Sequence, residues 1–205
     1  PHDVSELIKL IGDDNAFEDR LDLLFEKELS HEKIKEHEDI AGLIGQYAHG
    51  NEPSHHIAYL YNYAGKPWRT QERIRQIMDT LSSDKPDGLA GNDDVGQMSA
   101  WYIFSAMGFY PVAPGDLSYA IGAPQLPEIS LNLANGKKFT VKATRLSEQN
   151  KYIASAQLNG KPLNRSYITH DDINSGGVLE FTMSSQPNKK WANKQTERPP
   201  SMSVH

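Results

Sequence analysis

The chain has 205 residues, of which 38% are hydrophobic, a formal net charge of −6 and no cysteine. This length and composition suit one globular domain, or two small ones, with a buried core. An acidic balance without a basic stripe argues against nucleic-acid binding, and the missing cysteines exclude disulfides and thiolate chemistry. No apolar run approaches the roughly 18 residues that a membrane helix needs.

Residues 1–115 are predicted to be helical. Asp3 and Glu6 form a capping-box pattern ahead of the first apolar run, Pro53 suits a first helical position, and Gly12 and Gly108 are stop signals. Apolar residues at helical spacing predict helices at about 3–11, 16–28, from 53 onward, 70–81 and 95–107. The charged segment from His31 to Ile40 is expected on the surface.

Residues 116–192 are predicted to form an antiparallel β-region, a sheet or a sandwich. The turn dipeptides Asn135-Gly136, Asn159-Gly160 and Gly176-Gly177 separate the short runs, and Asn-Gly between such runs is a strong hairpin signal. The alternating segments are 117–121, 129–133, 139–143, 152–158, 167–169 and 178–183. Residues 193–205 are polar and are expected to be a loose tail. The fold class is therefore α+β.

Two polar loops stand out as candidate sites. Residues 49–56 and 91–97 each lie just ahead of a predicted helix and concentrate glycine with amide, carboxylate or imidazole side chains. In the second loop, Asp94-x-x-Gln97 is itself a capping-box pattern, so Asp94 has an ordinary structural interpretation. A carboxylate at a helix N-terminus also stays ionised, which is the state that a general base needs.

The first loop also has a structural interpretation. Glu52 and Pro53 can simply start a helix, and His55 and His56 can be one buried and one exposed histidine. Neighbouring histidines can bind zinc, but the expected ligand spacing is missing. The oxygen donors Asn51, Glu52, Asp93 and Asp94 suit calcium better.

Aromatic residues cluster in 101–104 and 109–110. Such residues can stack on sugars, but at helical spacing they are more often core, and core is the interpretation favoured here. Trp68 and Trp101 are the aromatic residues expected to reach a pocket.

Long stretches of the chain resemble glycoside hydrolase family 92. The resemblance is carried by residues 44–56 (IGQYAHGNEPSHH), 59–61 with 65–68, and 91–102 (GNDDVGQMSAWY) continuing to 108–112, and it extends from Pro1 to about Ala192. It implies a calcium-dependent, exo-acting, inverting alpha-mannosidase, most often specific for alpha-1,2 linkages, that removes terminal mannose from glycans. It also implies secretion or export to the periplasm.

The resemblance assigns parts of the family's architecture to this chain. Residues 1–115 would be the C-terminal part of an (α/α) six-hairpin barrel, and an antiparallel β-sandwich region would follow. The family's catalytic acid lies on a Glu-Gly-Asn motif that precedes the match to Pro1. The chain opens without methionine, so we expect it to be a fragment without that acid, inactive alone and partnered by the missing N-terminal part.

The resemblance also implies roles for individual residues. Asp94 would be the general base, and Asn92 occupies a position where some members carry a second carboxylate. Calcium would be bound by Asn51, Glu52 and Asp94. Mannose would contact His49, Glu52, His55 and Trp68.

Two other functions fit parts of the same sequence. A non-catalytic carbohydrate-binding or structural module could keep the fold, although it would need neither Asp94 nor Glu52. Another (α/α)-barrel enzyme, such as a sugar phosphorylase, would need a phosphate site rich in Ser, Thr, Lys or Arg near the base, and residues 91–97 offer none.

Overall fold

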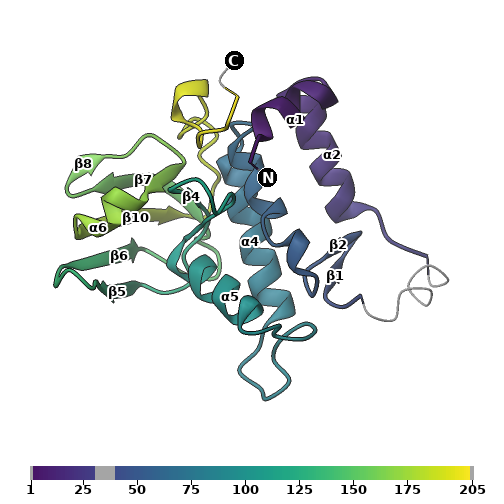
Figure 1. The fold of residues 1–205 in the computed structure, drawn as a ribbon, viewed down its shortest axis with the longest axis horizontal. Coiled ribbons are helices and arrows are strands. Elements are labelled where there is room, and N and C mark those ends of the chain that lie inside the picture. Colours follow the sequence, from purple (N-terminus) through teal and green to yellow (C-terminus); the bar gives the residue numbers. More distant parts are fainter. Residues whose placement is uncertain (1, 31–39, 204–205) are drawn as a thin grey trace.

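The computed structural model describes residues 2–30 and 40–203 and places a helical half beside a sheet-containing half (Figure 1). The helical half runs in the order α1 (Val4–Ile11), α2 (Asp14–Glu26), β1 (Leu43–Ile44), β2 (Tyr47–Ala48), the 3-10 helices η1 (Glu52–Ser54) and η2 (Ile57–Asn62), α4 (Pro67–Leu81) and α5 (Gln97–Met107). Among the described helices, none is long and apolar enough to cross a membrane.

Local signals explain where most of these helices begin and end. The Asp3 side chain accepts a hydrogen bond from the Glu6 amide at 3.1 Å, Pro67 opens α4, and Gly108 ends α5 in the left-handed conformation. The predicted helices at 3–11, 16–28, 70–81 and 95–107 are confirmed. The segment after Pro53 forms two 3-10 turns instead of an α-helix. The predicted surface segment 31–40 falls mostly on residues 31–39, which lie outside the described residues.

The sheet-containing half holds two sheets. One has the order β5-β6-β10-β7-β8 and the other β3-β4-β9. The elements are β3 (Phe109–Tyr110), β4 (Ser118–Ile121), β5 (Glu128–Asn132), β6 (Lys138–Thr144), β7 (Tyr152–Leu158), β8 (Lys161–Pro162), β9 (Tyr167–Thr169), α6 (His170–Asn174), β10 (Gly177–Ser184) and η3 (Gln195–Glu197). All six predicted strands are present, so the α+β class is confirmed.

One strand pair departs from the expected antiparallel arrangement. Strands β6 and β10 are parallel, whereas β5–β6, β7–β8 and β7–β10 are antiparallel. The Asn-Gly dipeptides at 135–136 and 159–160 form hairpin turns, but Gly176-Gly177 follows α6. The chain leaves β9 in the other sheet and crosses through α6, so β10 enters beside β6 in the same direction.

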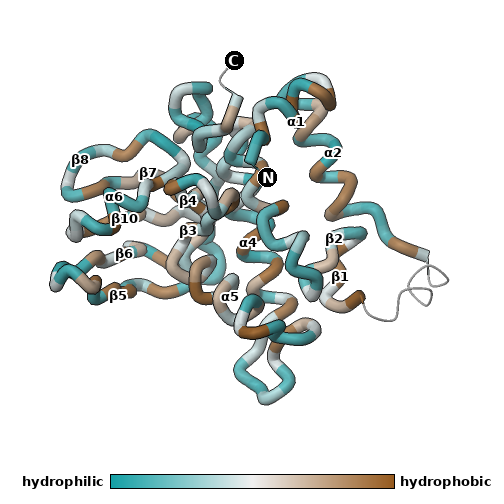
Figure 2. The backbone as a smooth tube through the Cα atoms, viewed as in Figure 1, coloured by the Kyte–Doolittle hydropathy of each residue, from teal (hydrophilic) through white to brown (hydrophobic). Residues whose placement is uncertain are grey.

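Two apolar cores correspond to the two halves. The helical core contains Phe17, Tyr59, Ile74, Ile77 and Trp101. The sheet core contains Phe109, Phe139, Val141, Leu179 and Phe181. Figure 2 shows apolar and hydrophilic residues interspersed along α1 and α2. Leu10 on α1 is 77% exposed, and the described helices do not close a barrel.

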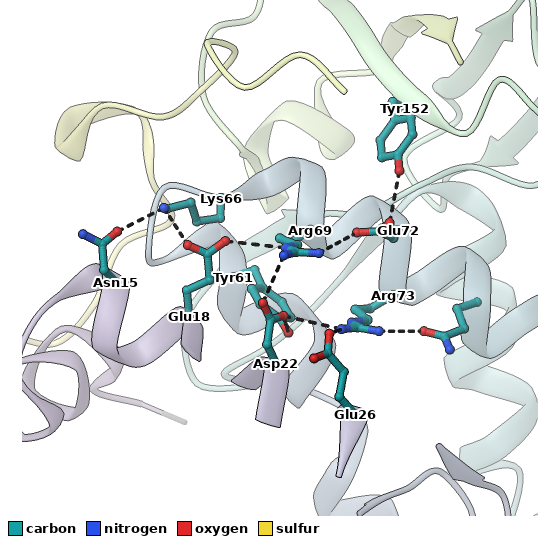
Figure 3. Close-up of polar contacts among 11 residues, drawn as sticks. Asn15, Glu18, Asp22, Glu26, Tyr61, Lys66, Arg69, Glu72, Arg73 and Tyr152 are labelled. Atoms are coloured by element: carbon teal, nitrogen blue, oxygen red, sulfur yellow. Dashed lines mark hydrogen bonds and ion pairs between the residues drawn. The ribbon is translucent and has the colours of Figure 1, made fainter. Parts of the chain in front are cut away.

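An ion-pair network joins α2 to α4 (Figure 3). Lys66 lies 2.6 Å from Glu18, and Arg69 lies 3.1 Å from Asp22. Arg73 also contacts Asp22, at 3.5 Å. Every acid of this interface faces a cation, so the network holds α2 against the start of α4 with its charges compensated.

The expected loose tail is instead fixed, as far as residue 203, against the N-terminal helices. Arg198 donates to both carboxylate oxygens of Asp14, at 2.9 and 2.7 Å, and to the Tyr63 carbonyl. Ser201 donates to Asp3 at 3.0 Å, and Ser203 also donates to this carboxylate. These hydrogen bonds to Ser203 and Ser201 lower the pKa of Asp3 to about 2. The polar residues of the tail therefore donate hydrogen bonds to carboxylates near the other end of the sequence.

Candidate active site

The structure brings the two polar loops together. The carboxyl groups of Glu52, on η1, and Asp94, just before α5, lie close enough to shift each other's pKa. Two carboxyl groups in close contact do not both ionise readily. The hydrogen bond and charge of Glu52 raise the pKa of Asp94, and the same hydrogen bond lowers the pKa of Glu52. Asp94 is exposed and Glu52 is half-buried, so the pair is open to a ligand.

The Asp94 carboxyl is not a helix cap, which corrects the capping-box interpretation. Gly96 is the N-cap of α5, with no side-chain cap bond. The neighbouring Asp93 accepts from the Ser99 amide at 2.9 Å and from the Ser99 hydroxyl at 3.0 Å. Because Asp93 serves the helix start, the Asp94 carboxyl is left to face Glu52.

The backbone beside this carboxyl is strained. Asp94, Val95 and Gly96 have φ angles of 48°, 60° and 89°, which places three successive residues in the left-handed region. A β-branched residue such as Val95 rarely adopts this region, and its side chain is fully exposed. Strain of this kind persists only where surrounding contacts hold it, and it gathers at functional sites.

A histidine cluster lies beneath the loops. His49 is only 1% exposed, and its Nδ1 lies 3.0 Å from the Tyr47 hydroxyl. Burial lowers the pKa of His49 to about 3, so its ring is neutral at working pH. His55 is buried and His56 is half-buried. Both nitrogens of His55 lie at hydrogen-bond distance from protein atoms, which argues against its use as a zinc ligand.

Of the two tryptophans expected at a pocket, Trp68 lines a cavity and Trp101 does not. Trp101 is fully buried in the helical core and donates to the His55 carbonyl at 2.9 Å, so the core interpretation holds for it and the pocket expectation was wrong. Trp68 is half-buried between Arg69 and Lys189, whose charged groups lie 4.5 and 4.6 Å from its ring centre. It lines a cavity of about 510 Å³ whose lining includes no residue of either polar loop.

The donor set beside the carboxyl pair suits a hard cation. Asn51 precedes Glu52 and is exposed, as is Asn92 ahead of Asp94. Calcium takes six to eight oxygen ligands, and Glu52, Asp94 and Asn51 offer carboxylate and amide oxygens. Within the described part of the chain, no group of three or more His, Asp or Glu side chains is arranged to hold a metal. A calcium ion here would therefore need ligands beyond these residues.

Similarity to known proteins adds to this geometry. The sequence model described as the Glycosyl hydrolase family 92 catalytic domain matches residues 1–185. A protein of Arthroderma benhamiae named "Uncharacterized secreted glycosidase" is 33% identical over an alignment 205 residues long, which covers 98% of this chain and 24% of that protein.

Solved structures give the same picture. The family GH92 alpha-mannosidase of Bacteroides thetaiotaomicron, in complex with mannoimidazole, matches with a TM-score of 0.93, 46% identity and coverage of 100% of this chain and 27% of that one. A family GH92 inverting mannosidase from the same organism matches with a TM-score of 0.85, 40% identity and coverage of 98% and 28%. The chain thus spans about a quarter of the length of these relatives.

Proposed function

Since the chain belongs to glycosyl hydrolase family 92, we propose that it forms part of an exo-acting alpha-mannosidase that releases terminal, alpha-1,2-linked mannose from glycans. The observation that carries the proposal is the meeting of the two polar loops, joined by the His55–Gln97 bond, which brings the Glu52 and Asp94 carboxyls together, open to solvent. Two similar structures are mannosidases, and one of them holds mannoimidazole. The name of the fungal relative supports a secreted protein.

In the proposed reaction Asp94 is the general base. A base must accept a proton from the attacking water, and Asp94 presents an exposed carboxyl on a left-handed turn. Because Glu52 raises the pKa of Asp94, the ionised base form needs a cation beside the pair, which the proposed calcium would supply. Asn92 lies two residues before Asp94 and would assist in holding the water.

Glu52 is poorly placed to be the catalytic acid. Inverting enzymes keep their acid and base carboxyls about 6.5–9.5 Å apart, and retaining enzymes keep theirs about 5–5.5 Å apart. Glu52 and Asp94 shift each other's pKa strongly, which places the two carboxyl groups in close contact and leaves no room for a water between them. The proposed acid therefore comes from the part of the family's length that this chain does not span.

Calcium is the proposed cofactor, bound by Glu52, Asp94 and Asn51. When bound, it would offset the negative charge of the paired carboxyls and coordinate mannose hydroxyls. The remaining ligands would be water, sugar oxygens or groups outside this chain. The carboxyl pair supports the site, because a cation can take the place of the proton that two such groups otherwise share.

Contacts with mannose are proposed for Glu52 and, from beneath the loops, for His49. Trp68 lines a separate cavity, so its proposed sugar contact would require the other part of the enzyme to bring glycan to it. The proposed partner of this chain is the N-terminal part found in family members, either in the same polypeptide or as a separate chain that assembles with it.

Hydrolysis of alpha-1,2-mannobiose tests this function. We expect the full-length protein, with calcium present, to release mannose, and the 205-residue chain alone to release none. Binding of mannobiose without turnover by the full-length protein would favour a non-catalytic carbohydrate-binding module instead. Rapid release of mannose by the chain alone would require an acid within these residues, with Glu52 the first candidate.

A further inference from the structure

The two polar loops meet twice, at matching positions. Glu52 lies beside Asp94, and three residues further along each segment His55 is hydrogen-bonded to Gln97, with Nδ1 and Nε2 of the two side chains 3.2 Å apart. The outer pair is open to solvent, whereas His55 is only 1% exposed. The His55–Gln97 contact is thus shielded from solvent, whereas the Glu52–Asp94 contact is open to it.

Only one neutral tautomer of His55 satisfies both of its hydrogen bonds. Its Nε2 lies 2.9 Å from the His49 carbonyl, which can only accept, so Nε2 carries the proton. Nδ1 is then an acceptor, and the amide nitrogen of Gln97 donates to it. Gln97 also lies 3.4 Å from the Tyr110 hydroxyl, which fixes the amide from a third element.

The loop that carries Asp94 needs such support. The strained residues 94–96 receive little packing of their own, since Val95 is fully exposed and a Cβ on Gly96 would meet no atom within 4 Å. The Asp93–Ser99 bonds fix the start of α5 from the solvent side. The His55–Gln97 bond fixes it from the buried side. Further along α5, Trp101 also donates to the His55 carbonyl at 2.9 Å, so α5 is tied to the Glu52 segment at two points.

We propose that His55 is a positioning residue that, through Gln97, sets the separation of the Glu52 and Asp94 carboxyls. This assignment replaces direct contact of His55 with mannose, because the ring is buried and both of its nitrogens are engaged. Only the expected effect of His55 on catalysis rests on the proposed function. The physical link between the loops is independent of any substrate.

Gln97→Leu tests the link, because it removes the donor and keeps a side chain of similar size. Amide hydrogen exchange in the full-length protein should speed up about tenfold or more at residues 93–98, as expected when a buried hydrogen bond is lost. The relevant amides are those of Gln97 and Met98, which donate to Asp94 and Asp93 carbonyls. The matched control is Gln125→Leu, which loses a 2.9 Å bond to Asp79 away from the site and should leave these amides unchanged.

Kinetics test the positioning role. In Gln97→Leu, kcat on alpha-1,2-mannobiose should fall about 100-fold with little change in KM, because misplacement of a catalytic group by about 1 Å costs that much. His55→Leu should behave alike. His55→Gln keeps an N–H for the His49 carbonyl and an oxygen for Gln97, so it should recover most of the loss.

Each outcome decides the proposal. Unchanged exchange at residues 93–98 in Gln97→Leu, or exchange that rises equally across the whole protein, would overturn the link. Faster local exchange with unaltered kcat would overturn the positioning role. If the wild-type protein hydrolyses no mannoside, the proposed function fails, and the exchange experiment still decides whether His55 and Gln97 hold the loops together.

Discussion

The α2–α4 interface and the junction of the two polar loops both gather acidic side chains, yet they treat them in opposite ways. At the interface, Glu18 and Asp22 each face lysine or arginine (Figure 3). At the loop junction, Glu52 and Asp94 face each other, and among the described residues neither forms an ion pair with lysine or arginine. Compensated charge holds elements together, whereas uncompensated charge is available to bind a cation or to take a proton.

The largest expected effect is the loss of calcium from the loop junction. Chelation of the full-length enzyme should abolish mannose release, and added calcium, but not zinc, should restore it, because the donors are oxygens. Turnover of alpha-1,2-mannobiose before and after each addition is the measurement. Activity unchanged by the chelator would show that hydrolysis does not require calcium.

Replacement of Asp94 should come next in size. Asp94→Ala should lower kcat by about 10²–10⁴-fold, which is the usual cost of losing a general base, without lowering thermal stability. Steady-state kinetics together with a thermal melt check both halves of this prediction. A folded Asp94→Ala enzyme with near-normal kcat would show that the carboxyl has another role.

A substitution in the α2–α4 interface should instead lower stability and leave kcat unchanged. The Arg73 side chain is only 9% exposed, contacts Glu26 at 2.9 Å and lies over the Phe25 ring. Arg73→Ala should cost about 1–3 kcal/mol of unfolding free energy, because it removes a buried side chain packed on Phe25 together with one cation of the network, with kcat unchanged. Urea unfolding measures this.

An exposed ion pair provides the matched control. Lys142 lies 3.6 Å from Glu128, with both side chains well exposed, so Lys142→Ala should change stability by less than about 1 kcal/mol. If both variants had equal effects, burial of the Arg73 network would not be what stabilises the interface.

The smallest expected effect concerns backbone strain beside Asp94. Val95→Gly removes a β-branched side chain from a residue with φ of 60° and should raise stability by about 1 kcal/mol. The same change frees the loop, so kcat should fall modestly. A lower melting temperature in this variant would contradict the assignment of strain to Val95.

Local signals made much of the fold predictable. Capping residues and apolar spacing located α1 and α2, and alternation located strands such as β7. Non-local pairing was out of reach of such patterns. Arg198 binds Asp14 across 184 positions of the sequence, so a polar tail that looked loose is docked. The parallel β6–β10 pair likewise depends on the route of the chain through another sheet.

The site was predictable to a similar degree. The sequence indicated both polar loops, and the structure places Glu52 against Asp94. Spacing alone misassigned the cap, because Asp93 and Asp94 are chemically alike and only the strained turn decides which one faces the helix. It also gave no sign that Trp68 lies at another cavity, or that Gln97 meets His55. The only available signal for that contact was the shared three-residue spacing from each carboxylate.

The stereochemistry of the first product tests the central claim most directly. If Asp94 activates water opposite the leaving group, hydrolysis of an alpha-1,2-mannoside inverts the anomeric centre. Proton NMR of the full-length enzyme's reaction, recorded before mutarotation, should then show β-mannose accumulating first. Initial formation of α-mannose would show retention and would contradict the role of Asp94 as a base.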